Sequence, residues 1–395
     1  MVATAVLENE MTARNPGSST PVAASFVVLS TYPPTHCGLA TFANALCGGL
    51  EDVGVAKVGV IRVVDELVND SDARVVAQLV SGSQRSRVDA ARVINGFDYL
   101  LVQHEFGIFG GPDGIEVLEL LDDVIIPIIV TLHTVPLVPT TGQRQVLEAI
   151  AEIAQNLVTM TAAAKDRLLA GYSLDADKVV TVPHGATVPH ALETSPAGKT
   201  RLLTWGLLGF GKGIEHVIDA LALLPDLIDD IEFVIAGQTH PKIVLKEGER
   251  YRDMLKRRAS VLGVSPMISF DDTYRPLPSL LNLISQSTCV VLPYDSPDQI
   301  TSGVLVDAIA AGRPVIATGF PHAVELLSGG AGMVVPHQDP AALARAIRQV
   351  ATNDALVSSM VSATVPLSAE HKWTAVATRY VDVANSASST WSVAV

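Results

Sequence analysis

The sequence is poor in cysteine, in charge and above all in basic residues, and each shortage excludes a class of protein. Its 395 residues include only three cysteines, Cys37, Cys47 and Cys289. They are too few for a disulfide framework and lack the paired spacing of a zinc site, so we expect a cytoplasmic protein without structural metal. Lys and Arg total 27 against 41 Asp and Glu, with no basic run. Binding to nucleic acid or to an anionic membrane is therefore not expected.

Long apolar runs are also missing. Runs such as 124–132 are interrupted by Asp, His or Pro well before the roughly 18 residues that a membrane span needs. The polar start has no basic segment followed by an apolar core, so no secretion signal is predicted and residues 1–23 are expected to be a flexible lead. With 48% apolar and 17% charged residues, the rest can bury large cores, and its length suggests two domains.

From about residue 24, short β-branched runs alternate with Ala- and Leu-rich stretches of helical period. This pattern predicts an α/β fold of parallel sheets covered by helices. The runs include 26–29, 58–63, 99–102, 127–132, 157–161 and 179–182 in the first half, and 202–205, 232–236, 267–270, 289–292, 314–317 and 332–335 in the second. Between the halves, 186–200 has the proline, serine and glycine content of an interdomain connection.

Each half opens with a strand, a glycine-containing turn and a helix, at 27–50 and at 202–223. Two such openings predict two Rossmann-like, doubly wound domains that face each other across a cleft. Ligands of open α/β sheets bind outside the carboxyl ends of the strands, often with an anion at a helix N-terminus. We therefore expect the functional residues to lie between the domains.

The second opening resembles a Walker phosphate loop, because it reads Gly206-Leu-Leu-Gly-Phe-Gly211-Lys212-Gly213. Gly213, however, replaces the Ser or Thr that would bind magnesium, and the following strand ends in Gly-Gln where an Asp would be needed. A P-loop NTPase is thus a minor alternative. Lys212 in the first turn of a helix opposes the helix dipole by about 0.3–1 kcal/mol unless an anion lies nearby. A bound phosphate is expected there, the alternative being a solvated lysine.

A second informative block runs from 290 to 327. A buried strand leads into a loop with Ser302 and Gly303, and the helix that follows would present free amides to an anion. Gln299 and Asp307 stand eight residues apart, before and inside that helix. They could address different parts of one ligand, such as a sugar ring and a ribose. Alternatively, Asp307 is a polar residue on an exposed helix face.

These motifs together resemble the retaining glycosyltransferases of family GT4, which have the GT-B fold. The resemblance extends over nearly the whole chain after the first two dozen residues. It rests on the order and spacing of Tyr-Pro-Pro-Thr-His-Cys-Gly38, Thr-Leu-His133, Val-Pro-His184-Gly185, Lys212-Gly213-Ile-Glu and the 290–327 block with its Ala-Ala-Gly-Arg-Pro-Val-Ile-Ala ending. It implies an N-terminal acceptor domain of 24–190, to which a C-terminal helix of about 370–395 crosses back, and a C-terminal donor domain of 200–369.

The resemblance also implies roles for matching residues. His133 would contact the sugar near the reacting carbon, Lys212 would pair with the donor diphosphate, and Gln299 would face the transferred sugar. Asp307, in place of the second glutamate of the family's E-x7-E motif, would bind the ribose. The donor-binding set is Gly38, Gly206, Gly211, Thr301, Ser302, Gly303, Val304 and Asp307.

Two departures from the family remove charge. Gln299 replaces the first glutamate of the motif and cannot act as a base. Leu207 replaces the arginine of the diphosphate clamp, for which Arg201 is a candidate substitute. A catalytically inactive protein that binds a nucleotide sugar is therefore the main alternative to an enzyme.

Other polar residues receive weaker assignments. His104 and Glu105 end a strand before a glycine-rich loop and are candidates for acceptor binding, the alternative being a structural histidine. His184 is expected to shape the turn at the domain boundary, and His36 and Cys37 to be structural. Asp175-Ala-Asp177 resembles a metal-binding D-x-D motif, but its position before a strand favours a surface turn.

The sequence thus predicts a metal-independent retaining glycosyltransferase without a bound cofactor. It would move a sugar from a nucleoside diphosphate sugar, of the GDP-mannose or UDP-glucose type, to a hydroxyl of a saccharide or small-molecule acceptor. Lys212 and helix amides would stabilise the leaving diphosphate. The low charged fraction makes an oligomer possible.

Overall fold

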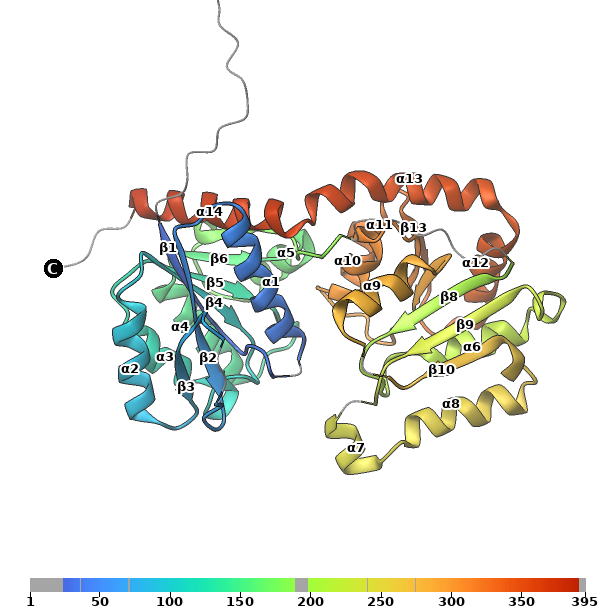
Figure 1. The fold of residues 1–395 in the computed structure, drawn as a ribbon, viewed down its shortest axis with the longest axis horizontal. Coiled ribbons are helices and arrows are strands. Elements are labelled where there is room, and N and C mark those ends of the chain that lie inside the picture. The colour runs from blue at the N-terminus through green and yellow to red at the C-terminus, as the bar shows by residue number, and fades with distance from the viewer. Residues whose placement is uncertain are drawn as a thin grey trace, which may run out of the picture.

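The computed structural model describes residues 24–35, 37–69, 72–188, 198–239, 241–273 and 275–390. The predicted lead, His36 and the last five residues lie outside this described part. Two parallel β-sheets, each wrapped by helices, lie side by side and are joined along one edge by the last two helices (Figure 1). In this part of the chain no helix is long and apolar enough to cross a membrane.

The N-terminal sheet has the strand order β3-β2-β1-β4-β5-β6-β7, with every pairing parallel. Its strands are β1 (Ser25–Ser30), β2 (Lys57–Val64), β3 (Val75–Val80), β4 (Tyr99–His104), β5 (Ile128–Leu132), β6 (Asn156–Thr159) and β7 (Val179–Thr181). Its helices are α1 (Gly38–Asp52), α2 (Gln84–Ile94), α3 (Glu116–Leu121), α4 (Thr141–Ile153) and α5 (Ala162–Gly171), with the short 3-10 turns Pro112–Gly114 and Ala176–Lys178. The edge strand β3 was missed in the sequence because it is only half-buried and so lacks a continuous apolar run.

The C-terminal sheet has the order β10-β9-β8-β11-β12-β13, again all parallel. Its strands are β8 (Thr200–Trp205), β9 (Ile231–Ala236), β10 (Ile268–Asp271), β11 (Cys289–Leu292), β12 (Val315–Thr318) and β13 (Gly332–Val335). Its helices are α6 (Ile214–Ala222), α7 (Pro241–Glu247), α8 (Arg250–Val261), α9 (Leu277–Ser285), α10 (Gly303–Ala310), α11 (Pro321–Leu327) and α12 (Pro340–Thr352), with 3-10 turns at Pro225–Leu227 and Ser265–Met267.

The predicted pair of doubly wound α/β domains is therefore confirmed. In both sheets the strand order reverses next to the first strand of the domain, between β1 and β4 and between β8 and β11. Such switch points open a crevice at the carboxyl ends of the strands, where ligands bind. The central strands are buried on both faces, as continuous apolar runs require, and Phe26, Val28 and Leu29 are fully buried.

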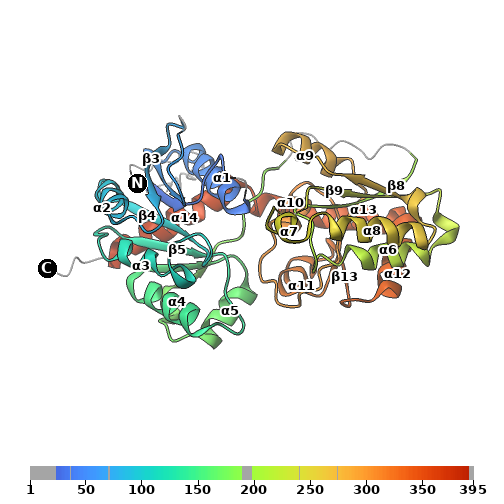
Figure 2. The ribbon, with the colours of Figure 1, turned by 90° about the horizontal axis from the view of Figure 1, so that it is seen from below.

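Local sequence sets the start of the helices nearest the domain boundary. Cys37 is the N-cap of α1, and its sulfur accepts a hydrogen bond from the Ala40 amide at 3.4 Å. Ser302 is the N-cap of α10, and its hydroxyl accepts from the Leu305 amide at 3.3 Å. Both helices begin at the carboxyl edge of their sheets and point their N-termini toward the boundary between the domains, where Figure 2 shows α1 on one side and α10 on the other.

The C-terminal segment crosses back to the N-terminal domain, as predicted. Helix α13 (Asp354–Glu370) packs along α10 and α12, and α14 (Trp373–Thr390) packs on α1 (Figure 1). Tyr380 on α14 is buried in the N-terminal core, where its hydroxyl shares a 2.8 Å hydrogen bond with Thr131 of β5. Gly49 permits this packing, because a Cβ there would lie 2.7 Å from the Trp373 carbonyl oxygen.

The two chain crossings between the domains are tied to each other. The Ala186 amide donates to the His371 carbonyl at 2.7 Å, and His371 Nδ1 is 2.7 Å from the His184 carbonyl oxygen. Ala186 and Lys372 also form a parallel β-bridge. The outgoing and returning segments thus form one connection beside the domain boundary.

Candidate functional site

A pocket of about 420 Å³ lies between the two domains. Helix α1 and the strand ends of the N-terminal domain supply one wall, and α10 supplies the other. Six residues of the predicted catalytic and donor-binding set line this pocket: Gly38, His133, Thr301, Gly303, Val304 and Asp307. The structure therefore brings together groups from both domains, whereas Gly206, Gly211, Lys212, Gln299 and Ser302 do not line this pocket.

The α10 wall offers hydrogen-bond donors to the pocket. The Ser302 hydroxyl caps α10, and the Ser302 backbone amide donates to His322 Nδ1 at 2.9 Å. Within the described residues, the amides of Gly303 and Val304 have no acceptor, and the buried Thr301 hydroxyl has no partner. Because free amides at a helix N-terminus attract anions, this wall is suited to a phosphate.

Two neutral histidines line the opposite side of the pocket. His133, directly after β5, contacts the Gln103 side-chain oxygen through Nε2 at 2.9 Å, and burial lowers its pKa to about 3. Burial likewise lowers the pKa of His184 to about 4. Phe42 of α1 packs edge-on against both rings, with centroid distances of 4.8 and 5.0 Å. When the Gln103 side-chain oxygen faces Nε2 of His133, Nε2 carries the proton and donates it to that oxygen, and Nδ1 keeps a lone pair.

His184 has a position that sequence reasoning did not anticipate. It was expected only to shape the boundary turn, but it lines the pocket and approaches α10 from the other domain. A Cβ at Gly303 would lie 3.1 Å from His184 Nε2, so the glycine lets the imidazole approach the helix start. Neither the Val-Pro-His184-Gly185 motif nor the 290–327 block predicts that His184 lies against Gly303 at the start of α10, because this contact depends on how the two domains dock.

Asp307 lies in the second turn of α10 and faces the pocket. Its side chain is half-buried, and burial raises the pKa of its carboxyl to about 7. It is thus not a solvated residue on an exposed helix face. A carboxyl in this state can both donate and accept hydrogen bonds near neutral pH.

The loop that carries Gln299 is held by the other domain. The Thr161 hydroxyl donates to the Ile300 carbonyl at 2.9 Å, and Arg167 Nη1 donates to the Asp298 carbonyl at 3.0 Å. The Ile300 side chain packs in the N-terminal core. Gln299 itself is half-buried and donates through Nε2 to the Thr301 carbonyl at 3.1 Å.

A second contact links helix α11 of the C-terminal domain to helix α5 of the N-terminal domain. The Glu325 carboxylate at α11 accepts from the amides of Ala162 and Ala163 at 2.9 and 3.0 Å, and so caps the N-terminus of α5. A carboxylate in that place is stabilised by the free amides and by the helix dipole. The loop before α10 and helix α11 are therefore both anchored on the N-terminal domain.

The glycine-rich turn before α6 holds Lys212 in a partly desolvated place. Its Nζ lies 4.9 Å from the centroid of the Tyr294 ring, and burial lowers its pKa. The side chain is half-buried rather than solvated. Removing an ammonium from water is unfavourable without a counter-charge, so this site favours an anionic ligand.

Gly213 argues against the NTPase alternative. It adopts a left-handed conformation with φ of 66°, and a Cβ there would collide with the Pro293 carbonyl. The position that carries the magnesium-binding hydroxyl in a phosphate loop therefore has no room for a side chain.

A smaller, mostly apolar pocket of about 120 Å³ lies at the carboxyl ends of β8, β9 and β10. Gly206, Leu207, Gly237 and Arg275 are among its lining residues. Arg275 is held by Asp271, with Nε at 2.7 Å from Oδ2, and by the Ser279 hydroxyl at 3.0 Å. This arginine was missed in the sequence, because it lies in a loop, five residues after the predicted strand 267–270.

The suggestion that Arg201 replaces the missing clamp arginine is wrong. Arg201 lies at the amino end of β8 and pairs with Glu232 of β9 at 2.8 Å. Leu207 lies beyond the carboxyl end of the same strand, so Arg201 is at the opposite edge of the sheet. Arg275, which lines the same pocket as Leu207, is the arginine that the tertiary structure places there.

The residues suggested for acceptor binding, His104 and Glu105, do not line the interdomain pocket. His104 is fully buried between Phe106 and Phe109, burial lowers its pKa to about 4, and its ring nitrogens have no partner within the described residues. It has no exposed surface for an acceptor in this conformation. Glu105 accepts a hydrogen bond from the Thr134 hydroxyl at the neighbouring strand end.

Two groups of acidic residues resemble metal sites. Asp175 accepts the Asp177 amide at 3.0 Å and caps a short turn, as a surface turn requires. Glu215, His216 and Asp295 bring ligand atoms within 4.8 Å of one another. His216 Nε2 already contacts Asp295 at 3.0 Å, and Glu215 already accepts from the Tyr251 hydroxyl at 2.6 Å. These groups thus satisfy one another within the protein.

The C-terminal domain matches a known family in sequence. Residues 199–353 match the model of the family described as Glycosyl transferases group 1. A D-inositol 3-phosphate glycosyltransferase of Streptomyces coelicolor is 27% identical over 276 residues, which cover 61% of this chain and 56% of that protein. A phosphatidyl-myo-inositol mannosyltransferase of Mycobacterium leprae is 26% identical over 214 residues, which cover 52% of each. The chain thus spans just over half the length of these relatives.

Comparisons of structure agree with the fold over most of the chain. A sucrose-phosphate synthase of Thermosynechococcus elongatus aligns with a TM-score of 0.73 at 16% identity, covering 93% of this chain and all of that one. A glycosyltransferase of Rickettsia africae gives 0.71 at 14% identity with the same coverage. An Anabaena protein in complex with UDP and glucose gives 0.70 at 15% identity, covering 92% of this chain and 100% of that one. Together with the two switched sheets and the returning C-terminal helix, these matches show that the chain has the GT-B fold, and its residues 199–353 match the family of group 1 glycosyl transferases.

Proposed function

We propose that the protein is a retaining glycosyltransferase that moves a sugar from a nucleoside diphosphate sugar to a hydroxyl of an acceptor. The observation that carries this proposal is the interdomain pocket, where the free amides of α10 and Asp307 face Gly38 and His133. The names of these relatives describe transfer to inositol-containing acceptors, and one structural neighbour holds UDP and glucose. These support a nucleotide-sugar donor, of the UDP-glucose or GDP-mannose type.

The donor would lie along the carboxyl edge of the C-terminal sheet. The base would enter the apolar pocket lined by Gly206 and Arg275, and Asp307 would hydrogen-bond the ribose. The diphosphate would lie between the Lys212 ammonium and the amides of Gly303 and Val304. Among the described residues, Lys212 has no carboxylate partner and the Gly303 and Val304 amides have no acceptor, and a diphosphate there would supply both.

The reaction would need no protein nucleophile. The bond between the anomeric carbon and the diphosphate oxygen breaks, and the acceptor oxygen bonds to that carbon from the same face. The acceptor proton passes to the departing diphosphate oxygen. Lys212 and the α10 amides stabilise the negative charge that develops on the diphosphate, without a divalent ion. Gln299 would hydrogen-bond the transferred sugar without acting as a base.

His133 would complete the sugar site from the N-terminal domain. Its low pKa keeps the imidazole neutral at physiological pH. A neutral ring can accept a hydrogen bond from a sugar hydroxyl at Nδ1 without placing a second positive charge near the anomeric carbon, which becomes positive in the transition state.

Calorimetric titration of the full chain with UDP, GDP, ADP and their sugars tests this function. We expect at least one nucleoside diphosphate to bind in the presence of EDTA, and slow release of diphosphate from the matching sugar donor. Proton NMR of the product should show the donor's anomeric configuration. If no nucleoside diphosphate binds, the proposed function is wrong; if a donor binds without hydrolysis or transfer to any acceptor, the protein is a nucleotide-sugar binder instead.

A further inference from the structure

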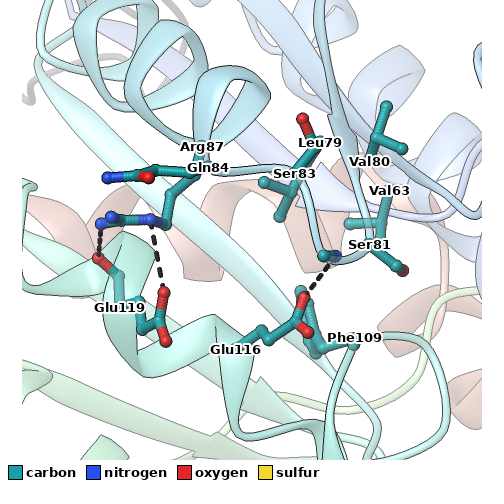
Figure 3. A pocket seen from close by; sticks show the side chains of 12 residues that line it. Val63, Leu79, Val80, Ser81, Ser83, Gln84, Arg87, Phe109, Glu116 and Glu119 are labelled. Atoms are coloured by element: carbon teal, nitrogen blue, oxygen red, sulfur yellow. Dashed lines mark hydrogen bonds and ion pairs between the residues drawn. The ribbon is translucent and has the colours of Figure 1, made fainter.

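A separate cavity of about 310 Å³ opens on the N-terminal domain (Figure 3). It lies at the carboxyl ends of β2 and β3, between the start of α2 and the start of α3. It shares no lining residue with the interdomain pocket. Both lie at the carboxyl edge of the same parallel sheet, so a ligand that crosses this edge can reach both.

The walls of this cavity are tied together by the protein itself. The Gly82 amide donates to Glu116 Oε2 at 2.7 Å, and Arg87 Nη1 donates to the Glu119 carbonyl at 2.9 Å (Figure 3). Arg87 Nη1 also pairs with Asp123 at 2.7 Å. These contacts link α2 to α3 across the opening, so the cavity is present before any ligand arrives and little ordering is needed for binding.

The charge on the walls is not suited to an anion. Glu116 and Glu119 face one cation, Arg87, which Asp123 and Glu119 already neutralise. The N-termini of α2 and α3 would otherwise attract an anion. Here Glu116 and Glu119 already occupy the first turn of α3, and Glu116 binds the amide that precedes α2. A phosphate entering the cavity would therefore meet two carboxylates.

The remaining lining combines neutral polar groups with an apolar wall. Gln84 presents an amide, and Ser81 has a hydroxyl that donates to Asp65 Oδ1 at 3.4 Å, while Val63, Leu79 and Phe109 present hydrocarbon. Sugar rings have the matching surfaces, because their hydroxyls donate to carboxylates and amides and their C–H faces pack on apolar and aromatic side chains.

We propose that this cavity binds an uncharged, hydroxyl-rich ring of the acceptor, a saccharide or cyclitol unit without phosphate. The inference rests on the proposed function and deepens it by naming the acceptor class. It separates this protein from the relatives that are named D-inositol 3-phosphate glycosyltransferases. The carboxylates of Glu116 and Glu119 are the groups that exclude the phosphorylated form.

The position of the cavity also indicates the size of the acceptor. In the sheet order β2-β1-β4-β5, three strand spacings separate the end of β2 from His133 after β5. At about 4.8 Å for each spacing, the distance is roughly 14 Å. A ring in the cavity is therefore not the ring that reacts, and the acceptor must contain at least one further unit that reaches the interdomain pocket.

Saturation-transfer NMR on the full chain tests the acceptor class. The probes are maltose and myo-inositol, each compared with a phosphorylated counterpart, maltose 1-phosphate and myo-inositol 1-phosphate. We expect the neutral probe of each pair to bind at least fivefold more tightly. Glu119→Lys, at an exposed carboxylate, should reduce or reverse this preference, while the exposed Glu152→Lys on α4 should leave it unchanged.

A filled cavity provides the second test. Ser81→Trp places a large side chain in the cavity and should weaken binding of the neutral probes at least tenfold, with nucleoside diphosphate affinity within twofold of the wild type. The proposal is overturned if neutral probes do not bind, if phosphorylated probes bind more tightly to the wild type, or if Ser81→Trp binds the neutral probes normally. Nucleotide binding in the same samples reports separately on the proposed function, which fails if the wild type binds no nucleoside diphosphate.

Discussion

The Thr161 hydroxyl at the start of α5 donates to the Ile300 carbonyl at 2.9 Å, across the boundary between the domains. Ile300 belongs to the chain of the C-terminal domain, yet its side chain is buried in the core of the N-terminal domain. The loop that leads into α10 is thus positioned by the opposite domain. Domain closure and the arrangement of the donor loop should therefore be one event.

Thr161→Val tests this coupling. Thr161 also caps α5 through the Ala164 amide, so the variant should lose about 1 kcal/mol of stability from the cap alone. It also leaves the buried Ile300 carbonyl without its donor, and we expect nucleoside diphosphate affinity to fall at least fivefold. Thr140→Val, which removes the equivalent cap of α4 at Gln143, is the control and should lose stability without loss of affinity. Equal affinities for the two variants would contradict the coupling.

Lys212→Ala should weaken diphosphate binding by about 1–3 kcal/mol, the range expected for a charge-assisted contact. The physical reason is that Lys212 is the partly desolvated cation next to the proposed diphosphate position. Lys256→Ala is a matched control, because Lys256 also packs on an aromatic ring, at 5.6 Å from the Phe270 centroid. Isothermal titration with the preferred nucleoside diphosphate measures both. If both variants bind like the wild type, Lys212 is not part of the site.

Arg275→Ala should weaken nucleoside diphosphate binding several-fold, because Arg275 lines the pocket proposed for the base. Arg201→Ala is the control, since Arg201 also pairs with a carboxylate but lies at the amino end of β8. The ratio of the two dissociation constants, measured by titration, is the test. An effect of Arg201→Ala as large as that of Arg275→Ala would contradict the placement of the donor.

Asp307 should make stability depend on pH. In the folded protein its pKa is about 7, against a usual value of 3.8, so the native state holds a proton that the unfolded chain has released between these pH values. Stability should therefore fall as pH rises through this window, by at most about 1.4 kcal/mol per pH unit. Asp307→Asn should be more stable than the wild type at pH 8 and closer to it at pH 4.

Urea denaturation at pH 4 to 8 measures this difference. The exposed Asp382→Asn on α14 is the control and should follow the wild type at every pH. A parallel pH dependence in the wild type and Asp307→Asn would show that the Asp307 carboxyl is not the group that titrates.

Much of the architecture could be predicted from local patterns. The apolar runs at 26–29 and 289–292 are buried on both faces of parallel sheets, and the helical period after 373 marks the helix that returns to the N-terminal domain. Such patterns are readable because a strand or helix repeats the same burial requirement along its own length. The half-buried β3 escaped detection for the same reason, since its pattern is not continuous.

The sequence by itself determined the two α/β domains, the glycine turns and the helix start at Ser302. Only the tertiary structure decided which groups meet: His184 with Gly303, Ile300 with the opposite core, and Arg275 rather than Arg201 beside Leu207. The reason is that residue patterns report the local period and burial of an element. Contacts between distant segments depend on strand order, on which end of a strand a residue occupies and on how two separately formed cores dock.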